Sequence, residues 1–562
     1  MIKRLFAMIL CILMVIPALV GCSTFDPNED VGETINIYLE NEVYDFDPAF
    51  AYRSKEALQL TRLMFAGLFY IDDNGKLQKD LVKKYEIVDE EEQGIYSITF
   101  TLKETYWTDG SLVSAKDFLF AWKRLLDPSL VSDAAALLYE VRNAYDAKNG
   151  NCSVDDIGVY AINNNTLQIV FDQPIDYKDF LYNLASPCLV ALKELAVKDN
   201  HDWAKRPSTL VCNGPFLLRE VEYGKSLTLE RNTYYLRNRE KDSIKKYVTP
   251  YRLVVDYSKS PADQIVAFEK GEIAYVGNIA LDKRADYKSE AKVYNALSTL
   301  SCYFNLENVI FADANTRKAL SSAIDRTAIA EKLVFADAAT GLVPNGVFEA
   351  KKANKSFRSV GGNLISSADA SGSFSGEFSL TIADNEVHAA VADMLKSAWE
   401  GLGFKVNVVK LGTSATDVIL PEEKSPTKEF VNDDYHAALV SGEFDVILAD
   451  ISALDTDAFS MLAPYAAGYS GRNMTFTVDS YEDAYNITGY NNEVYNELIK
   501  NAFAEKNVAK RAAILHDAEK LLMEDMPVCP IVFTKKAVLT SGVKDIDVDY
   551  FGYSLFEDAK LK

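Results

Sequence analysis

The sequence predicts an α/β protein of two or three domains. Its 562 residues are too many for one hydrophobic core. Hydrophobic residues make up 48% of the chain and charged residues 25%, which is typical of a globular protein. Segments with helical and with strand periodicity alternate along the chain, and this alternation is the pattern of α/β domains.

The individual segments carry clear signals. Residues 35–39 form a strand-like run, and apolar residues alternate with polar ones over residues 96–102, the period of a half-buried strand. Apolar residues recur at helical spacing over residues 387–402, where nearby glycines predict the helix end. A strand is expected directly after it at residues 404–408, and another at residues 444–448.

The first residues predict export. A positive start is followed by an apolar run that is shorter than the roughly 20 residues of a membrane span. Residues 1–21 are therefore interpreted as a signal peptide. The sequence ending in Cys22 resembles a bacterial lipobox, which implies lipidation of Cys22, for example with palmitate, and residues 22–33 as a lipidated tether. The expected location is the extracytoplasmic face of the cell membrane. The alternative is an ordinary signal peptide with a chance cysteine.

Charge and residue usage argue against several functions. The 59 basic and 82 acidic residues give a net charge of −23, which repels phosphate backbones, so nucleic-acid binding is not expected. Five widely spread cysteines follow Cys22, which argues against a disulfide framework and a zinc site, although one or two bridges stay open. Only four histidines occur, without metal-ligand spacing. Nucleophile-elbow and phosphate-loop patterns fail, so we expect no enzyme, metal or cofactor.

A series of motifs runs from residue 44 to residue 533. Together they resemble solute-binding protein family 5, the substrate-binding lipoproteins of oligopeptide and dipeptide ABC transporters. The motifs, in order, are Asp47-Pro48-Ala49, Trp107-Thr108-Asp109-Gly110, Asn213-Gly214-Pro215-Phe216, Phe268-Glu269-Lys270-Gly271, Ala323-Ile324-Asp325-Arg326 and Met526-Pro527-Val528.

Most of these motifs have a structural explanation. Asp109-Gly110 and Asn213-Gly214 are turn dipeptides, in which glycine accepts a positive φ. The tryptophans Trp107 and Trp122 are expected to anchor the core. Arg326 is expected to end or brace a helix.

The resemblance implies a two-lobed, periplasmic-binding-protein-like α/β fold of class II type with an additional domain in the first lobe. The expected core of lobe I comprises residues 34–65, 206–300 and 534–562. The additional domain comprises residues 66–205, and lobe II residues 301–533. Such lobes close over a ligand about a hinge.

Ligand contacts follow only where positions match the family. By resemblance, Tyr275 lies near the peptide backbone, and His388 lines a side-chain pocket unless it is a surface residue at a helix start. Tyr139 is a weaker match. The family's carboxylate for the peptide ammonium falls on Leu454. Either Asp455 or Asp450 supplies that carboxylate, or the amine is held elsewhere, or the ligand is not a free-amine peptide.

The resemblance implies a monomeric, lipid-anchored binding protein that captures oligopeptides and delivers them to the permease subunits of an ABC importer. Two alternatives stay open among binding proteins. The same fold can hold a non-peptide solute, or the protein can be a receptor for peptide signals that does not import them. A surface hydrolase is the alternative from another class.

Overall fold

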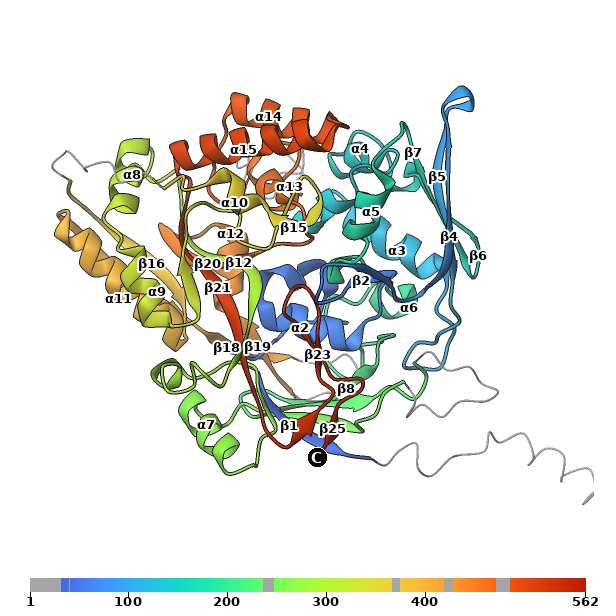
Figure 1. The fold of residues 1–562 in the computed structure, drawn as a ribbon, viewed down its shortest axis with the longest axis horizontal. Helices are drawn as coiled ribbons and strands as arrows, with labels where there is room; N and C mark the ends of the chain where they lie inside the picture. The colour runs from blue at the N-terminus through green and yellow to red at the C-terminus, as the bar shows by residue number, and fades with distance from the viewer. Residues whose placement is uncertain (1–31, 40, 236–246, 366–373, 419–427, 472–485) are drawn as a thin grey trace, which may run out of the picture.

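The computed structural model describes residues 32–39, 41–235, 247–365, 374–418, 428–471 and 486–562 (Figure 1). The predicted signal peptide, Cys22 and all but the end of the predicted tether lie outside the described residues.

One sheet of eleven strands forms the centre of the protein. Its two longest strands, β12 and β21, have 13 residues each and pair antiparallel through the middle (Figure 1). They join the two halves of the sheet. The order is β17 (Phe404–Leu411), β16 (Gly376–Ala383), β20 (Val446–Ser452), β12 (Lys292–Phe304), β21 (Val528–Thr540), β11 (Tyr275–Val276), β1 (Thr34–Tyr38), β10 (Arg252–Asp256), β9 (Ser226–Arg231) and β8 (Phe216–Glu222), with β13 (Ala336–Ala338) on β21.

The two halves of this sheet are the centres of the two lobes. The predicted boundaries at residues 300/301 and 533/534 fall inside β12 and β21, the two strands that pair in the middle of the sheet. The register of the pair shifts between Asn295 and Ser298, where the ladder is interrupted. Such an irregularity bends a strand pair, which suits a hinge. The exact domain boundaries stay a prediction.

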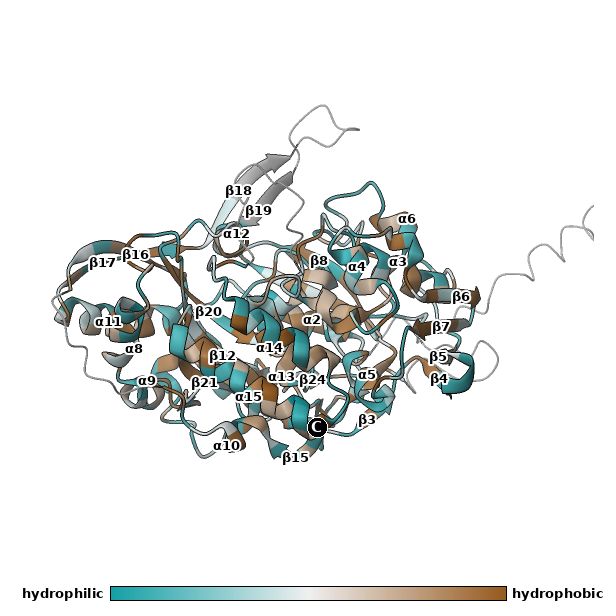
Figure 2. Cartoon of the chain, turned by 90° about the horizontal axis from the view of Figure 1, so that it is seen from above, coloured by the Kyte–Doolittle hydropathy of each residue, from teal (hydrophilic) through white to brown (hydrophobic). Residues whose placement is uncertain are grey.

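The second lobe contains a parallel unit in which α11 (Glu386–Gly401) connects β16 to β17. The predicted helix and the strand after it are confirmed. Asn385 caps the helix by accepting a hydrogen bond from the His388 N–H, and Val391, Leu395 and Trp399 enter the core. Helices α11, α14 (Glu493–Ala504) and α15 (Val508–Asp525) show both hydrophobic and hydrophilic stretches in Figure 2. This mixture is typical of helices with one buried face.

The additional domain lies on the right in Figure 1 and has its own antiparallel sheet. The strands, in order, are β4 (Val82–Glu90), β5 (Ile95–Leu102), β7 (Thr166–Phe171) and β6 (Val159–Asn163). Helix α3 (Ala115–Leu125) packs on it and carries Trp122. Trp107 and Trp122 are each 1% exposed, so their predicted core role is confirmed.

The remaining elements are shorter or peripheral. The helices are η1 (Pro48–Arg53), α2 (Lys55–Met64), α4 (Ala144–Lys148), α5 (Tyr177–Asn183), α6 (Glu194–Val197), α7 (Pro261–Glu269), α8 (Ala314–Ser322), α9 (Arg326–Leu333), α10 (Phe357–Gly361), α12 (Asp434–Ser441) and α13 (Ala458–Leu462), with further single 3-10 turns. The strands are β2 (Phe69–Ile71), β3 (Leu77–Lys79), β14 (Phe348–Glu349), β15 (Lys352–Ser356), β18 (Thr413–Val418), β19 (Lys428–Asp433), β22 (Val543–Lys544), β23 (Asp547–Val548), β24 (Ser554–Leu555) and β25 (Lys560–Leu561).

Two motif predictions are confirmed and one is wrong. Gly110 has a φ of +81°, as its turn requires. Arg326 braces the start of α9 by donating to the Ser321 and Pro530 carbonyl oxygens. Gly214, however, has no positive φ. A Cβ there would lie 2.4 Å from the Met64 carbonyl carbon, so close backbone approach explains this glycine.

Candidate functional site

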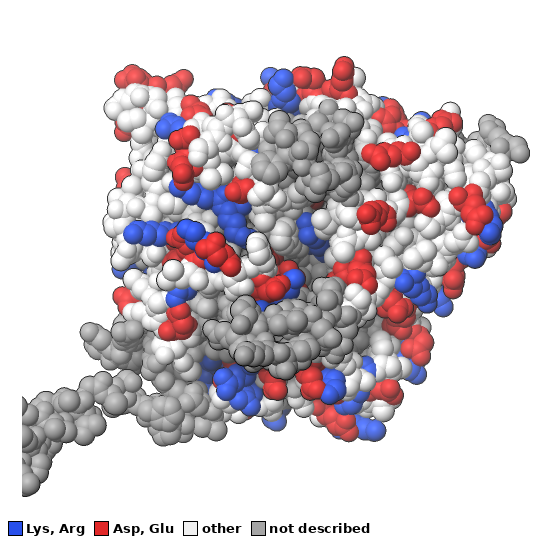
Figure 3. Space-filling view, turned by 180° about the vertical axis from the view of Figure 1, so that it is seen from behind, with Lys and Arg blue, Asp and Glu red and all other residues white. Residues whose placement is uncertain are grey.

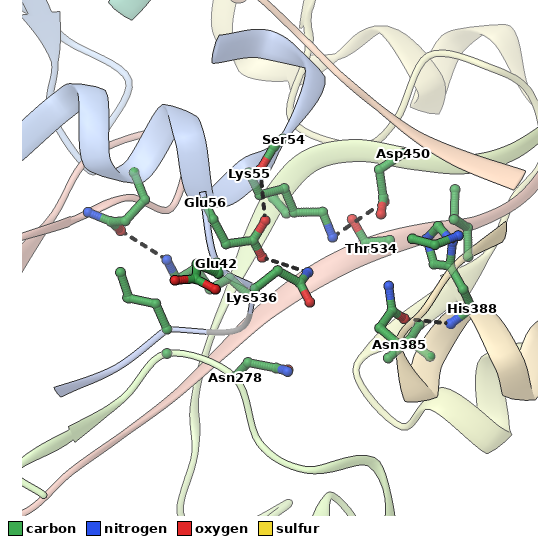
Figure 4. A pocket seen from close by; sticks show the side chains of 18 of the residues that line it. Glu42, Ser54, Lys55, Glu56, Asn278, Asn385, His388, Asp450, Thr534 and Lys536 are labelled. Atoms are coloured by element: carbon green, nitrogen blue, oxygen red, sulfur yellow. Dashed lines mark hydrogen bonds and ion pairs between the residues drawn. The ribbon is translucent and has the colours of Figure 1, made fainter. Parts of the chain in front are cut away.

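A cavity of about 280 Å³ lies between the two lobes. The first lobe contributes residues from η1, α2 and the loops after β1 and β11, and the second lobe contributes residues from α11, α12 and β20. Strand β21 crosses its floor (Figure 4). Because both lobes line this cavity, we call it the interlobe cavity, and its shape depends on how the lobes close.

An ion pair crosses the interlobe cavity. The Lys55 Nζ, at the start of α2, lies 3.3 Å from the Asp450 Oδ1 on β20 (Figure 4). The Ser298 hydroxyl also donates to Asp450 at 3.3 Å. The two charged side chains are 31% and 23% exposed, so solvent or a ligand reaches both. The pair places one carboxylate and one ammonium on opposite walls of one cavity.

A histidine makes a second contact between the lobes. On α12, the His436 Nδ1 lies 2.6 Å from the Asp433 carboxylate, and the His436 Nε2 lies 2.9 Å from the Arg53 carbonyl oxygen in the first lobe. Burial lowers the pKa of His436, but the hydrogen bond and charge of Asp433 outweigh it, so the pKa is raised. The imidazolium form is thereby favoured.

His388 lines the interlobe cavity, and its side chain is buried rather than on the surface. Its Nδ1 accepts a hydrogen bond from the Ala383 N–H at 3.2 Å, which leaves Nε2 as the protonated nitrogen. Burial lowers the pKa of His388 to about 4, so the ring is neutral near pH 7. The contact of His388 with a ligand stays a prediction.

Further charged groups line the interlobe cavity in both signs. On β21, the Lys535 Nζ pairs with Asp337 at 2.6 Å, and the Lys536 Nζ donates to the Gln59 side chain at 3.0 Å. Glu42 accepts from the Gly224 N–H at 3.0 Å, and burial raises its pKa. This mixture suits a ligand that carries both charges.

The structure separates the other predicted contacts from this cavity. Tyr275 is completely buried, its hydroxyl lies 2.7 Å from that of Ser554, and it is not among the described residues that line the interlobe cavity. Tyr139 packs against Tyr145 beside a different cavity. Asp455 is 3% exposed, and its carboxylate accepts from the Ser460 hydroxyl at 2.6 Å. Ligand contacts of these three residues stay predictions. Of the two candidate aspartates, only Asp450 lines the interlobe cavity.

Sequence reasoning missed Lys55 and His436. Neither belongs to a recognisable motif. Lys55 meets Asp450, and His436 meets the Arg53 carbonyl oxygen, only because the chain brings the two lobes together. Asp433 is the N-cap of α12 and His436 lies in its first turn, and this spacing is the one local signal in the sequence.

Other site types find no support in the described part of the chain. No group of three or more potential metal ligands occurs there, and the five cysteines in it are unpaired. No described helix has the length and apolar character needed to cross a membrane. Figure 3 shows acidic and basic side chains intermixed over one face, without a continuous basic surface.

Comparison with known proteins identifies the family. The sequence model of the bacterial extracellular solute-binding proteins, family 5 middle, matches residues 76–473. The chain belongs to this family. The dipeptide-binding protein DppE of Bacillus subtilis is 26% identical over 95% of both chains.

Two solved structures share the fold of this family-5 protein. The substrate-binding domain of an oligopeptide ABC transporter from Bacillus anthracis has a TM-score of 0.78 at 22% identity and covers 94% of this chain and 99% of its own. The pheromone receptor PrgZ has a TM-score of 0.77 at 23% identity and covers 95% of this chain and 100% of its own. The predicted two-lobed fold is confirmed. Family-5 members are binding proteins of transporters, so the protein is not an enzyme.

Proposed function

We propose that this protein captures a short peptide in the interlobe cavity and delivers it to the permease of an ABC importer. The observation that carries the proposal is the Lys55–Asp450 pair across the cavity. A free peptide has an ammonium and a carboxylate. Its ammonium can bind Asp450, and its carboxylate can bind Lys55. The relatives named for dipeptide and oligopeptide binding support a peptide as the ligand.

The ligand drives closure by replacing the Lys55–Asp450 ion pair with two ion pairs of its own, one to each residue. In the closed arrangement Lys55 and Asp450 satisfy each other, so the cavity holds no isolated charge there. A peptide replaces this single contact with two charge-assisted contacts, one on each lobe, and adds the burial of its own chain. Its larger affinity for the closed arrangement shifts the equilibrium toward closure.

Two measurements test this function. Mass spectrometry of material released from the gently purified, then denatured protein is expected to find short peptides, and recovery of one uniform non-peptide solute refutes the proposal. Calorimetry is expected to show that Asp450→Asn weakens binding of a free-amine peptide about tenfold or more, because a charged hydrogen bond is worth about 1.5–3 kcal/mol. The control Asp393→Asn, an exposed carboxylate on α11, is expected to bind normally.

We further propose a lipid anchor at Cys22, on the basis of the lipobox resemblance. A tether keeps the binding protein at high local concentration beside its permease. Fractionation of cells is expected to find the protein in the membrane fraction and the Cys22→Ala variant in the medium or periplasm. Equal membrane association of both proteins contradicts the anchor.

The similarity to PrgZ, a pheromone receptor by name, supports a second candidate. In this case the protein binds a peptide signal and reports it without supporting nutrition. Uptake of labelled peptides by a strain that lacks the gene separates the two: lost uptake supports import, and normal uptake supports sensing.

A further inference from the structure

A second, smaller cavity opens beside the interlobe cavity. It has a volume of about 100 Å³, and Arg53 and Asp450 line both cavities, so the two adjoin at Asp450. We call the smaller cavity the annex. The residues that line it are Tyr52, Arg53, Val131, Asp133, Tyr303, Leu439, Val440, Asp450, Ile451, Ser452, Leu454, Ser460, Met461, Pro464, Tyr465, Ser470, Asn486 and Ile487.

The walls of the annex are mainly apolar and come from both lobes. The first lobe contributes Tyr52 and Val131, and the second lobe contributes Tyr303, Ile451 and Tyr465, among others. This composition contrasts with the interlobe cavity, where Lys and Glu side chains are abundant. The annex therefore offers little to a polar group and a large gain to an apolar one.

Arg53 and the backbone of Asp133 are held by neighbouring groups at the edge of the annex. The Arg53 guanidinium lies 4.5 Å from the centre of the Phe50 ring and donates to the Val131 carbonyl oxygen at 3.1 Å. The Asp133 N–H donates to the Tyr52 hydroxyl at 3.2 Å. These contacts hold the first-lobe wall in place. Of the two acidic residues that line the annex, Asp450 is the one that also lines the interlobe cavity.

Because Asp450 lies where the annex meets the interlobe cavity, the ligand group that binds Asp450 determines which part of the ligand lies next to the annex. In a peptide, the terminal ammonium and the first side chain are attached to the same Cα. When the ammonium binds Asp450, that side chain starts within one or two bonds of the junction and reaches the annex without any change in the course of the peptide backbone. The rest of the peptide extends into the wider, polar interlobe cavity.

We propose that the annex selects peptides whose first residue has a medium-sized apolar side chain, such as leucine. This inference rests on the proposed function. Filling an apolar pocket with such a side chain gives about a 10- to 100-fold preference over glycine, which corresponds to about 1.4 to 2.8 kcal/mol. Burial of apolar surface also makes the heat-capacity change of binding more negative.

Calorimetry with the full chain tests the proposal with Leu-Gly-Gly and Gly-Gly-Gly. The wild type is expected to bind the leucine peptide at least tenfold more tightly. Ile451→Trp and, separately, Leu439→Trp add bulk to the annex wall, so each is expected to lose this preference while its affinity for Gly-Gly-Gly is unchanged. Val409→Trp, a substitution at an exposed site on β17, is the matched control and is expected to keep the preference.

The outcomes separate this inference from the proposed function. Equal binding of both peptides by the wild type overturns the selectivity of the annex but leaves peptide capture intact. A preference that survives both tryptophan substitutions also overturns it, because the leucine side chain then lies elsewhere. Absence of binding to both peptides refutes the proposed function, and this inference with it.

Discussion

His436 is expected to make closure of the lobes depend on pH. Its two ring nitrogens face a carboxylate oxygen of Asp433 and the carbonyl oxygen of Arg53, at 2.6 and 2.9 Å, and both partners only accept hydrogen bonds. Only the imidazolium donates to both. A neutral ring gives up one bond and places a nitrogen lone pair against an oxygen.

The size of the pH effect depends on which hydrogen bond of His436 is lost when the lobes open. Asp433 and His436 lie in the same lobe, so their pair persists when the lobes open, whereas the bond to Arg53 forms only in the closed arrangement. A hydrogen bond from a charged donor contributes about 1.5–3 kcal/mol. The His436 side chain is 28% exposed, so solvent screening reduces the contribution to about 1 kcal/mol, or roughly a fivefold change in affinity.

The sign is expected to follow from the Arg53 carbonyl oxygen, whose hydrogen bond raises the pKa of His436 only in the closed arrangement, whereas the pair with Asp433 raises it in both arrangements. The closed protein is then expected to bind this proton more tightly than the open one, so the contribution is fully present below the open-state pKa and is lost as pH rises through the higher closed-state value. The other titratable groups that act on this ring are the Arg53 guanidinium, whose charge lowers the pKa of His436, and His388, whose pKa of about 4 keeps it neutral across this range.

Calorimetry at about pH 6 and pH 8.5, in buffers of different ionisation enthalpy, measures affinity and proton uptake together. The wild type is expected to lose about fivefold in affinity at the higher pH and to take up protons on binding. His436→Gln is expected to lose this dependence, and His201→Gln, at an exposed site, is expected to keep it. The amine of the ligand titrates equally with all three proteins, so identical profiles for wild type and His436→Gln refute the reasoning.

Two further substitutions test the packing. Arg358→Met removes the ion-pair partner at 2.5 Å from the fully buried Glu519, which keeps the Leu342 and Val343 N–H groups as donors, and is expected to lower the free energy of unfolding by about 3–5 kcal/mol in a urea titration; a loss below about 1 kcal/mol contradicts a stabilising role of this ion pair. Gly214→Ala places a Cβ against the Met64 backbone and is expected to cost about 1–3 kcal/mol, whereas Gly401→Ala, with open space around its Cβ, is expected to cost nothing; equal thermal midpoints for the two variants contradict the close approach.

The sequence predicted the fold well because fold signals are local. Apolar spacing marked α11 and the strand after it, and the turn at Gly110 follows from a dipeptide. The motif series added the two lobes, since motifs of this kind record backbone requirements such as the bracing contacts of Arg326. These features depend on neighbours that are close in the chain or fixed by the core.

The site was harder to predict because its contacts join distant segments. Lys55 and Asp450 meet only through closure of the lobes, and nothing around either residue marks it as half of an ion pair. Tyr275 shows that a residue close in the chain to the cavity lining need not line the cavity itself. It lies two residues before Gly277, which does line the interlobe cavity, but its own side chain is buried in the core against the Phe556 ring and the Ser554 hydroxyl.

The last prediction concerns which aspartate near the end of β20, Asp450 or Asp455, binds the ammonium of the peptide. The Asp455 Oδ1 accepts from the Ser460 hydroxyl at 2.6 Å and from the Asp457 N–H at 2.9 Å, so this carboxyl already shapes the turn before α13. Burial and the charge of Asp457 raise the pKa of Asp455, which favours a neutral acid. A neutral, hydrogen-bonded acid is a poor partner for an ammonium.

Asp455→Asn is therefore expected to bind a free-amine peptide within about twofold of wild type, whereas Asp450→Asn binds about tenfold more weakly. An acid with a raised pKa costs stability as pH rises above its ordinary value near 4, so Asp455→Asn is also expected to make unfolding less sensitive to pH between about 4 and 8. Urea titrations across that range measure the second effect. If Asp455→Asn instead loses affinity while Asp450→Asn keeps it, the ammonium is held at Asp455, and the turn before α13 must rearrange when the ligand binds.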